Sequence, residues 1–92
     1  MTTGSVNGMR VSTILRDTGC TAVIVSDDLL PNVDVEKCAK CKVRDYLGRV
    51  DIFPLVNVYV DCDWFTGWVN AVRAPIMYCS VLLGNVPGII FD

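Results

Sequence analysis

Short runs of apolar residues alternate with polar and turn-forming residues along the whole chain. Turn signals recur about every 8–12 residues, which is the spacing typical of an all-β domain. Asn7-Gly8 favours a type I′ turn between two runs, because both central residues of that turn need a positive φ. A loop with little regular structure is expected at 27–38. The segments expected to form strands are 3–6, 9–16, 21–26, 40–44, 49–61, 65–73, the segment "MYCSVLLGN" up to its stop at Gly84, and a short last strand in "VPGIIFD".

No stretch of about 10–15 residues carries the apolar periodicity of a helix. The pattern therefore predicts an all-β fold in the form of a small closed barrel or sandwich. The segment "DYLG" at 45–48 is expected to join the arms of a long hairpin, with Gly48 as the turn residue. Pro54 lies inside the second arm and favours an edge position or a bulge. The 92 residues fit one domain, which spans 1–92.

Hydrophobic residues make up 52% of the chain, which is high for so small a domain. We interpret the excess as apolar surface that a partner subunit or a ligand covers, and a well-filled core with a few exposed apolar residues is the alternative. The net charge of −2 and the lack of a basic run argue against nucleic acid as a partner. The longest nearly apolar run, 76–83, is far shorter than the roughly 20 residues of a membrane helix. With no visible signal peptide, an intracellular and cytoplasmic location is expected.

The chain has no histidine, which removes the mechanisms that need an imidazole base and most catalytic zinc sites. An enzyme of this composition would rely on carboxylates, Cys, Tyr or Lys for acid–base chemistry. The odd number of cysteines indicates reduced thiols in a reducing compartment. Cys38 and Cys41 form half of a structural zinc site with no second pair, so we interpret the pair as incidental and expect no metal and no cofactor. The cysteines are Cys20, Cys38, Cys41, Cys62 and Cys79.

A polar segment, "RDTG" at 16–19, interrupts the apolar runs "MRVSTIL" and "AVIV". An Asp at the end of a strand, followed by a hydroxyl and a glycine, suits a catalytic loop. Gly19 allows the backbone to approach closely, and Thr18 can offer its hydroxyl to a partner across an interface. Asp17 is then left facing a groove. The same three residues are also ordinary in a plain turn, so the segment alone leaves both interpretations open.

The surroundings of "DTG" resemble the active-site segment of the retropepsins, the aspartic proteases of retroviruses and LTR retrotransposons. The second signature of that family is two hydrophobic residues and a glycine, which stand here as Leu82-Leu83-Gly84, 67 residues after Asp17. "VNG" before an apolar strand matches the N-terminal hairpin of the family, and "DYLG" stands where the family has its flap. The segments "LRDTGCTAVIV", "FTGWVNAV" and "LLGNVPG" look closest to the proteases of gypsy-type retrotransposons and their host-captured relatives. The resemblance covers nearly the whole chain.

The resemblance implies a retropepsin-type barrel that works as a homodimer on extended peptide or polyprotein substrates, released from or part of a longer polyprotein. Asp17 of each subunit would share one proton and activate a water for attack on the peptide carbonyl. Thr18, Gly19 and Gly84 would support this loop, with Thr18 bonding across the dimer. The implied flap residues are Asp45, Tyr46, Leu47 and Gly48. The candidate substrate-binding residues, each equally compatible with an ordinary core, are Leu15, Cys20, Ala22, Ile24, Leu47, Ser80 and Leu82.

Two departures from the family pattern bear on the interface and on the loop. Only eight residues follow Gly84, and they contain Pro87-Gly88, so Ile89, Ile90 and Phe91 would have to carry the dimer interface. Thr21 and Asn85 stand where retroviral enzymes often place a salt-bridged Asp and Arg, and Arg16 is the candidate replacement. The alternative function is a catalytically inactive dimerisation or peptide-binding module, against which the intact "DTG" argues.

Overall fold

The computed structural model of the chain describes residues 2–19, 21–31, 34–44, 47–76 and 79–86. These residues form one sheet, with two single-turn 3₁₀ helices in the connection that was expected to hold little regular structure, η1 (Asp27–Leu29) and η2 (Val35–Lys37). The prediction of an all-β fold is confirmed. The strands are β1 (Thr2–Val6), β2 (Met9–Arg16), β3 (Val23–Ser26), β4 (Ala39–Arg44), β5 (Val50–Cys62), β6 (Phe65–Ala74) and β7 (Val81–Leu83).

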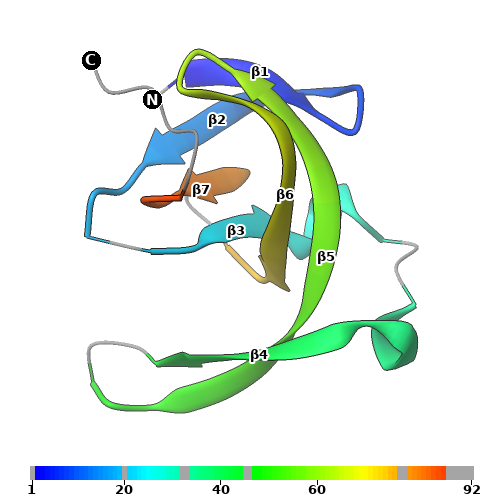
Figure 1. Cartoon of the computed structure of the whole chain (residues 1–92), viewed down its shortest axis with the longest axis vertical. Helices are drawn as coiled ribbons and strands as arrows, with labels where there is room; N and C mark the ends of the chain where they lie inside the picture. The colour runs from blue at the N-terminus through cyan, green and yellow to red at the C-terminus, as the bar shows by residue number, and fades with distance from the viewer. Residues whose placement is uncertain (1, 20, 32–33, 45–46, 77–78, 87–92) are drawn as a thin grey trace.

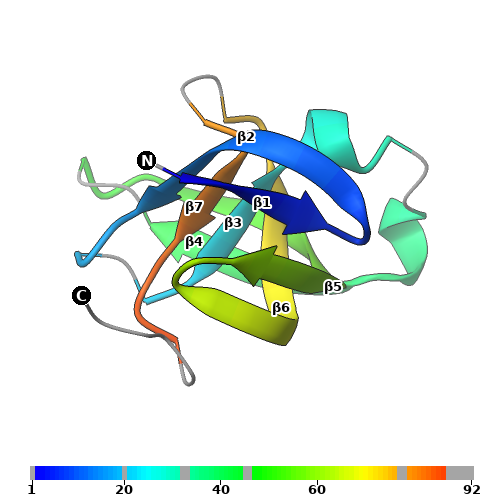
Figure 2. The same cartoon turned by 90° about the horizontal axis from the view of Figure 1, so that it is seen from above.

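The sheet closes on itself into a small barrel (Figures 1 and 2). Its strand order is β1-β2-β7-β3-β6-β5-β4, and β1 also pairs with β5, so that β4 alone stays outside the ring. The closure requires a glycine in β1. A Cβ at Gly4 would clash with the carbonyl oxygen of Asp61 and lie 2.8 Å from the Cβ of Cys62. The closed barrel expected from the sequence is therefore present.

The hairpins and turns follow their local sequence signals. Asn7 and Gly8 have φ values of 52° and 81°, as a type I′ turn requires. The Asn7 backbone N–H donates to the Tyr59 carbonyl and its Oδ1 accepts from the Tyr59 N–H, both at 2.8 Å, which fixes this turn to β5. Pro54 pairs with Lys40 of β4, whereas the β6 ladder begins one residue later, at Leu55. The edge position that Pro54 favours is confirmed.

Strand limits differ from the expected ones by more than one residue at two places. The strand expected at 21–26 begins only at Val23, and the run in "MYCSVLLGN" forms a three-residue strand. The short strand expected in "VPGIIFD" and the interface residues Ile89, Ile90 and Phe91 lie outside the described residues. In the part of the chain that the structure describes, no helix is long and apolar enough to span a membrane.

The barrel interior is filled mainly by β-branched residues that alternate along the strands. Ile14, Leu83 and Val23 are completely buried and come from the three adjacent strands β2, β7 and β3. Their neighbours Leu15, Leu82 and Ile24 point to the other face of the same strands. The largest fully buried side chains are Ile14, Leu83, Val6, Val23, Val25, Val58, Val60, Val72 and Val81.

Candidate functional site

Parallel pairing of β2 with β7 brings the two sequence motifs together. Arg16, the last residue of β2, pairs with Leu83, the last residue of β7, so the segments that follow both strands begin at the same edge. The Asp17 backbone N–H donates to the Leu83 carbonyl at 3.0 Å. The Gly84 N–H donates to the carbonyl of Ala22 at 2.9 Å, and Gly84 is buried. Residues 67 positions apart in sequence thereby form one loop cluster.

The Asp17 carboxylate is held by its own loop. Its Oδ1 accepts a hydrogen bond from the Gly19 N–H at 2.9 Å, which closes an Asx turn. A Cβ at Gly19 would lie 3.4 Å from this oxygen, in ordinary contact. Asp17 is half-buried, whereas Thr18 and Gly19 are exposed. The carboxylate is therefore oriented locally at a surface that water and a ligand can reach.

Arg16 and Asn85 connect the two halves of this loop cluster. The Arg16 Nη1 donates to the carbonyls of Asp17 (3.2 Å) and Leu83 (3.1 Å). Its Nη2 donates to Asn85 Oδ1 at 2.6 Å. The Asn85 Nδ2 in turn donates to the Thr18 carbonyl at 2.6 Å. Arg16 thus contacts the Asp17 loop through hydrogen bonds to a neutral side chain and to backbone carbonyls, in the place where the sequence suggested that it replaces a salt bridge.

An apolar row lies beside the loop. Leu82 of β7 pairs with Leu15 of β2 on one side and with Ile24 of β3 on the other, so their side chains share a face. Leu82 is only 6% exposed, whereas Leu15 and Ile24 are half-buried. Asp17 follows Leu15 by two residues and its N–H bonds the Leu83 carbonyl, so its loop begins at the end of this row. Three of the candidate substrate-binding residues therefore adjoin the Asp17 loop.

Ser80 lies further from the loop, at the opposite end of β7. Its hydroxyl is 2.8 Å from the Thr13 Oγ1, and its N–H donates to the Thr13 carbonyl at 2.8 Å. Thr13 was not among the sequence candidates, although its spacing of two from Leu15 was a usable signal. Both residues line a hollow of about 260 Å³ with Ser26, Asp28, Leu29, Ile76 and Cys79.

The hairpin of β4 and β5 extends beyond the barrel. Residues 39–44 pair with 50–55, and β5 meets β6 only from Leu55 onward. The described tip residues are Leu47 and Gly48, with a φ of 84° at Gly48. In both views the tip lies on the same side of the molecule as the loop after β2 (Figures 1 and 2). Of the other residues predicted for this site, Asp45, Tyr46 and Cys20 lie outside the described residues.

Apolar side chains on this hairpin are unusually exposed. Leu47 is 69%, Val50 47% and Ile52 61% exposed. Val50 and Ile52 alternate in phase with Val56 and Val58, so they continue the core-facing side of β5 beyond the barrel. A single chain therefore presents uncovered apolar surface on the hairpin that the sequence assigns to the flap.

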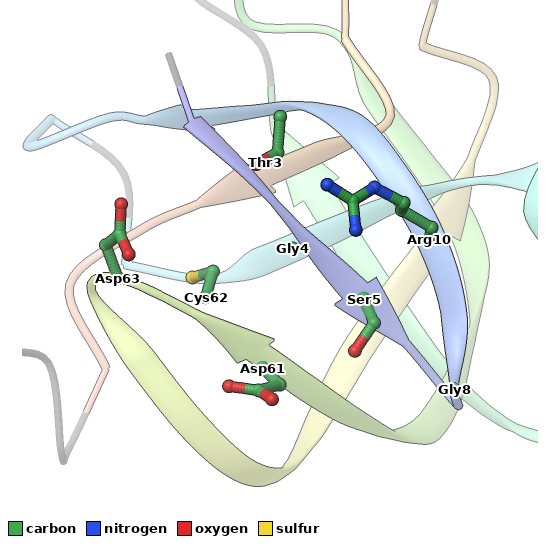
Figure 3. A pocket seen from close by; sticks show the side chains of 8 residues that line it. All are labelled: Thr3, Gly4, Ser5, Gly8, Arg10, Asp61, Cys62 and Asp63. Carbon is green, nitrogen blue, oxygen red and sulfur yellow. The ribbon is translucent and has the colours of Figure 1, made fainter.

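A larger hollow of about 460 Å³ lies elsewhere, over the seam where β1 meets β5 (Figure 3). Its charged groups are Arg10, Asp61 and Asp63. Both carboxylates bond to neighbouring hydroxyls, since Thr66 donates to Asp61 at 3.0 Å and Thr2 donates to Asp63 at 2.8 Å. Asp17 is not among the described residues that line this hollow or the smaller one.

The four cysteines that the structure describes do not gather into a metal site. Among the described residues, no group of three or more His, Cys, Asp or Glu side chains could hold a metal ion. The Sγ of Cys38 lies 3.3 Å from the Asp34 carbonyl, and that of Cys41 lies 3.7 Å from the Lys42 carbonyl. Cys79 is buried, and this burial raises the pKa of its thiol above the ordinary value.

No family model, curated protein or solved structure matches the chain.

Proposed function

We propose that this chain is one subunit of an aspartic endopeptidase of the retroviral and retrotransposon type. The observation that carries the proposal is the position of Asp17. Its "DTG" loop is bonded to the backbone of β7, its carboxylate is oriented by the Gly19 N–H, and it lies beside an apolar row. The carboxylate is thereby held in one orientation at the surface, whereas a plain surface turn would need no connection to Leu83, 66 residues further along the chain.

The proposed chemistry uses two copies of Asp17, one from each subunit of a homodimer. Two adjacent carboxyl groups cannot both ionise easily, so the pair holds one proton. The ionised Asp17 accepts a proton from a bound water, whose oxygen attacks the peptide carbonyl. The protonated Asp17 of the other subunit donates to the carbonyl oxygen. No imidazole and no cofactor take part, in keeping with a chain that has no histidine.

An extended peptide is the proposed substrate. It would lie between the Asp17 loops and the two β4–β5 hairpins, bound through main-chain hydrogen bonds like an added strand. The half-buried Leu15 and Ile24 would contact apolar side chains next to the scissile bond. The exposed Leu47 and Ile52 would be covered by the substrate or by the second flap. The groove would be complete only in the dimer, which explains why Asp17 lines no hollow in the described part of one chain.

The test is cleavage of a mixed peptide library by the purified protein, with products identified by mass spectrometry. Asp17→Asn should abolish cleavage, because an amide can neither accept the water proton nor share one. Asp61→Asn is the matched control, an exposed Asp away from the loop, and it should cleave normally. A statine-type inhibitor should block the wild type. Cleavage by purified Asp17→Asn would overturn the proposal.

The alternative, a binding module without activity, gives a different pattern. Such a module would dimerise and bind extended peptides, and neither peptide binding nor dimer formation would depend on the Asp17 proton. The enzyme should instead lose specific activity on dilution as the dimer dissociates, and sedimentation should show dissociation over the same concentration range. Peptide binding by wild type and Asp17→Asn alike, with no cleavage by either, would favour the module.

A further inference from the structure

Three backbone groups of Asp17 and Thr18 are held by partners within the same chain. The Asp17 N–H is bonded to Leu83, the Asp17 carbonyl accepts from Arg16, and the Thr18 carbonyl accepts from Asn85. Arg16 and Asn85 are also bonded to each other at 2.6 Å. A turn with exposed residues at its tip would ordinarily leave such carbonyls to water. Here the two side chains form a continuous bracket on the two peptide units that follow Asp17.

The chemistry of the two side chains suits this arrangement. Arginine presents several donors in a rigid plane, so one guanidinium can bond the Asp17 and Leu83 carbonyls and the Asn85 oxygen at once. Hydrogen bonds from a charged donor are roughly twice as strong as neutral ones. Asparagine has both an acceptor, which faces Arg16, and a donor, which faces Thr18. Neither lysine nor aspartate could make the same set of bonds, since lysine lacks the planar fork and aspartate lacks the donor.

We propose that Arg16 and Asn85 are positioning residues, which fix the conformation of the Asp17 loop within each chain before any contact with a second subunit. Their role in turnover rests on the proposed protease function, whereas their role in loop conformation does not. The bracket acts on the backbone that leads from Asp17 to Gly19, whose N–H orients the carboxylate, so its loss should impair the orientation of the carboxylate more than the binding of a peptide to the apolar row. The consequence is a selective loss of turnover.

Two measurements test the proposal. The first is amide hydrogen exchange followed residue by residue by NMR on the full chain. In Asn85→Ala the Gly19 amide, which bonds the Asp17 carboxylate, should exchange at least about tenfold faster. The Val25 amide, in the buried strand β3, is the control. A merely global loss of stability would accelerate both amides, whereas loss of the bracket should accelerate only the amide in the loop.

The second measurement is peptide-cleavage kinetics on matched variants. Asn85→Ala and Arg16→Gln should each lower kcat by about 10-fold or more, with KM changed less than about 2-fold. Asn85→Asp keeps oxygens for Arg16 and loses only the donor to Thr18, so its kcat should lie between those of wild type and Asn85→Ala. Arg16→Lys keeps the charge without the planar fork, so it should rescue kcat only in part. The double variant Arg16→Gln/Asn85→Ala should be scarcely worse than either single one, because the two side chains act as a unit.

The outcomes separate the two proposals. Faster Gly19 exchange together with a kcat-selective loss supports the bracket. Faster Gly19 exchange in a chain whose wild type cleaves no peptide supports the bracket as the determinant of loop conformation and overturns the proposed protease. Unchanged Gly19 exchange in Asn85→Ala overturns the bracket, whatever the activity. An equal rise in Gly19 and Val25 exchange also overturns it, since Asn85 would then only stabilise the whole fold.

Discussion

Ile14 and Ile52 place the same side chain in two opposite environments. Ile14 is completely buried where β1, β2 and β7 meet, whereas Ile52 is 61% exposed on the β4–β5 hairpin. Ile14→Ala removes three methyl or methylene groups, worth about 0.8 kcal/mol each, and leaves a cavity in a close-packed interior. We expect it to lower the free energy of unfolding by about 3–4 kcal/mol. The same change at Ile52 should cost less than about 1 kcal/mol, because most of this side chain already meets water.

Urea denaturation followed by circular dichroism measures both changes. It should be run at two protein concentrations, because a dimer that unfolds with its subunits gains apparent stability at the higher one. For a domain of this size the expected loss at Ile14 corresponds to a melting temperature lower by about 12–25 °C. Equal losses in the two variants, or a loss below about 1 kcal/mol at Ile14, would contradict the placement of β2 in the closed barrel.

Two further predictions concern ionisable groups. The rate of cleavage by the proposed Asp17 pair should follow a bell-shaped curve against pH, with an acidic maximum. No base remains when both acids are protonated, and no acid remains when both are ionised. A rate that rises steadily into alkaline pH and is blocked by thiol reagents would indicate a cysteine nucleophile instead. In the native protein, iodoacetamide should alkylate Cys41 well before Cys79, because burial raises the pKa of the Cys79 thiol and limits access to it. Peptide mass spectrometry measures the two rates, and equal rates would contradict the burial of Cys79.

Local signals in the sequence were sufficient for most of the strands. Asn7-Gly8 set the first turn because it supplies two positive φ values at little cost, and Gly48 supplies one positive φ in the turn of the long hairpin. Pro54 marked the point at which β5 loses β6 as a partner and continues with β4 alone. These features depend on residues close together in the chain. They could therefore be predicted without knowledge of which strands pair.

Features that depend on long-range pairing could not be predicted in the same way. Val11 and Ile14 both face the core although they are three positions apart, because the register of β1 against β2 shifts between Gly4 and Thr2. Strict alternation cannot anticipate this bulge. Similarly, the sequence alone shows Asn85 only as a neutral residue where retroviral enzymes often place a charged one. Its bonds to Arg16 and Thr18 exist only because β2 and β7 end at the same edge.

The register of β7 against β2 also determines where Asp17 lies. Both faces of these strands are apolar near the site, with Ile14 and Leu83 inside and Leu15 and Leu82 outside, so hydrophobicity alone fixes their register weakly. Hydrogen bonds between polar groups at the two ends of β7 make its register against β2 specific. Ser80 pairs its hydroxyl and its N–H with Thr13 at one end.

At the other end Arg16 bonds the Leu83 carbonyl. A slip of one residue would break both sets of bonds and turn the Thr13 hydroxyl toward the core, where an unpaired hydroxyl is costly. It would also move the Asp17 N–H away from Leu83 and shift the Asp17 loop relative to the apolar row. The polar pairs at the ends of β7 therefore link the packing of the barrel to the presentation of Asp17.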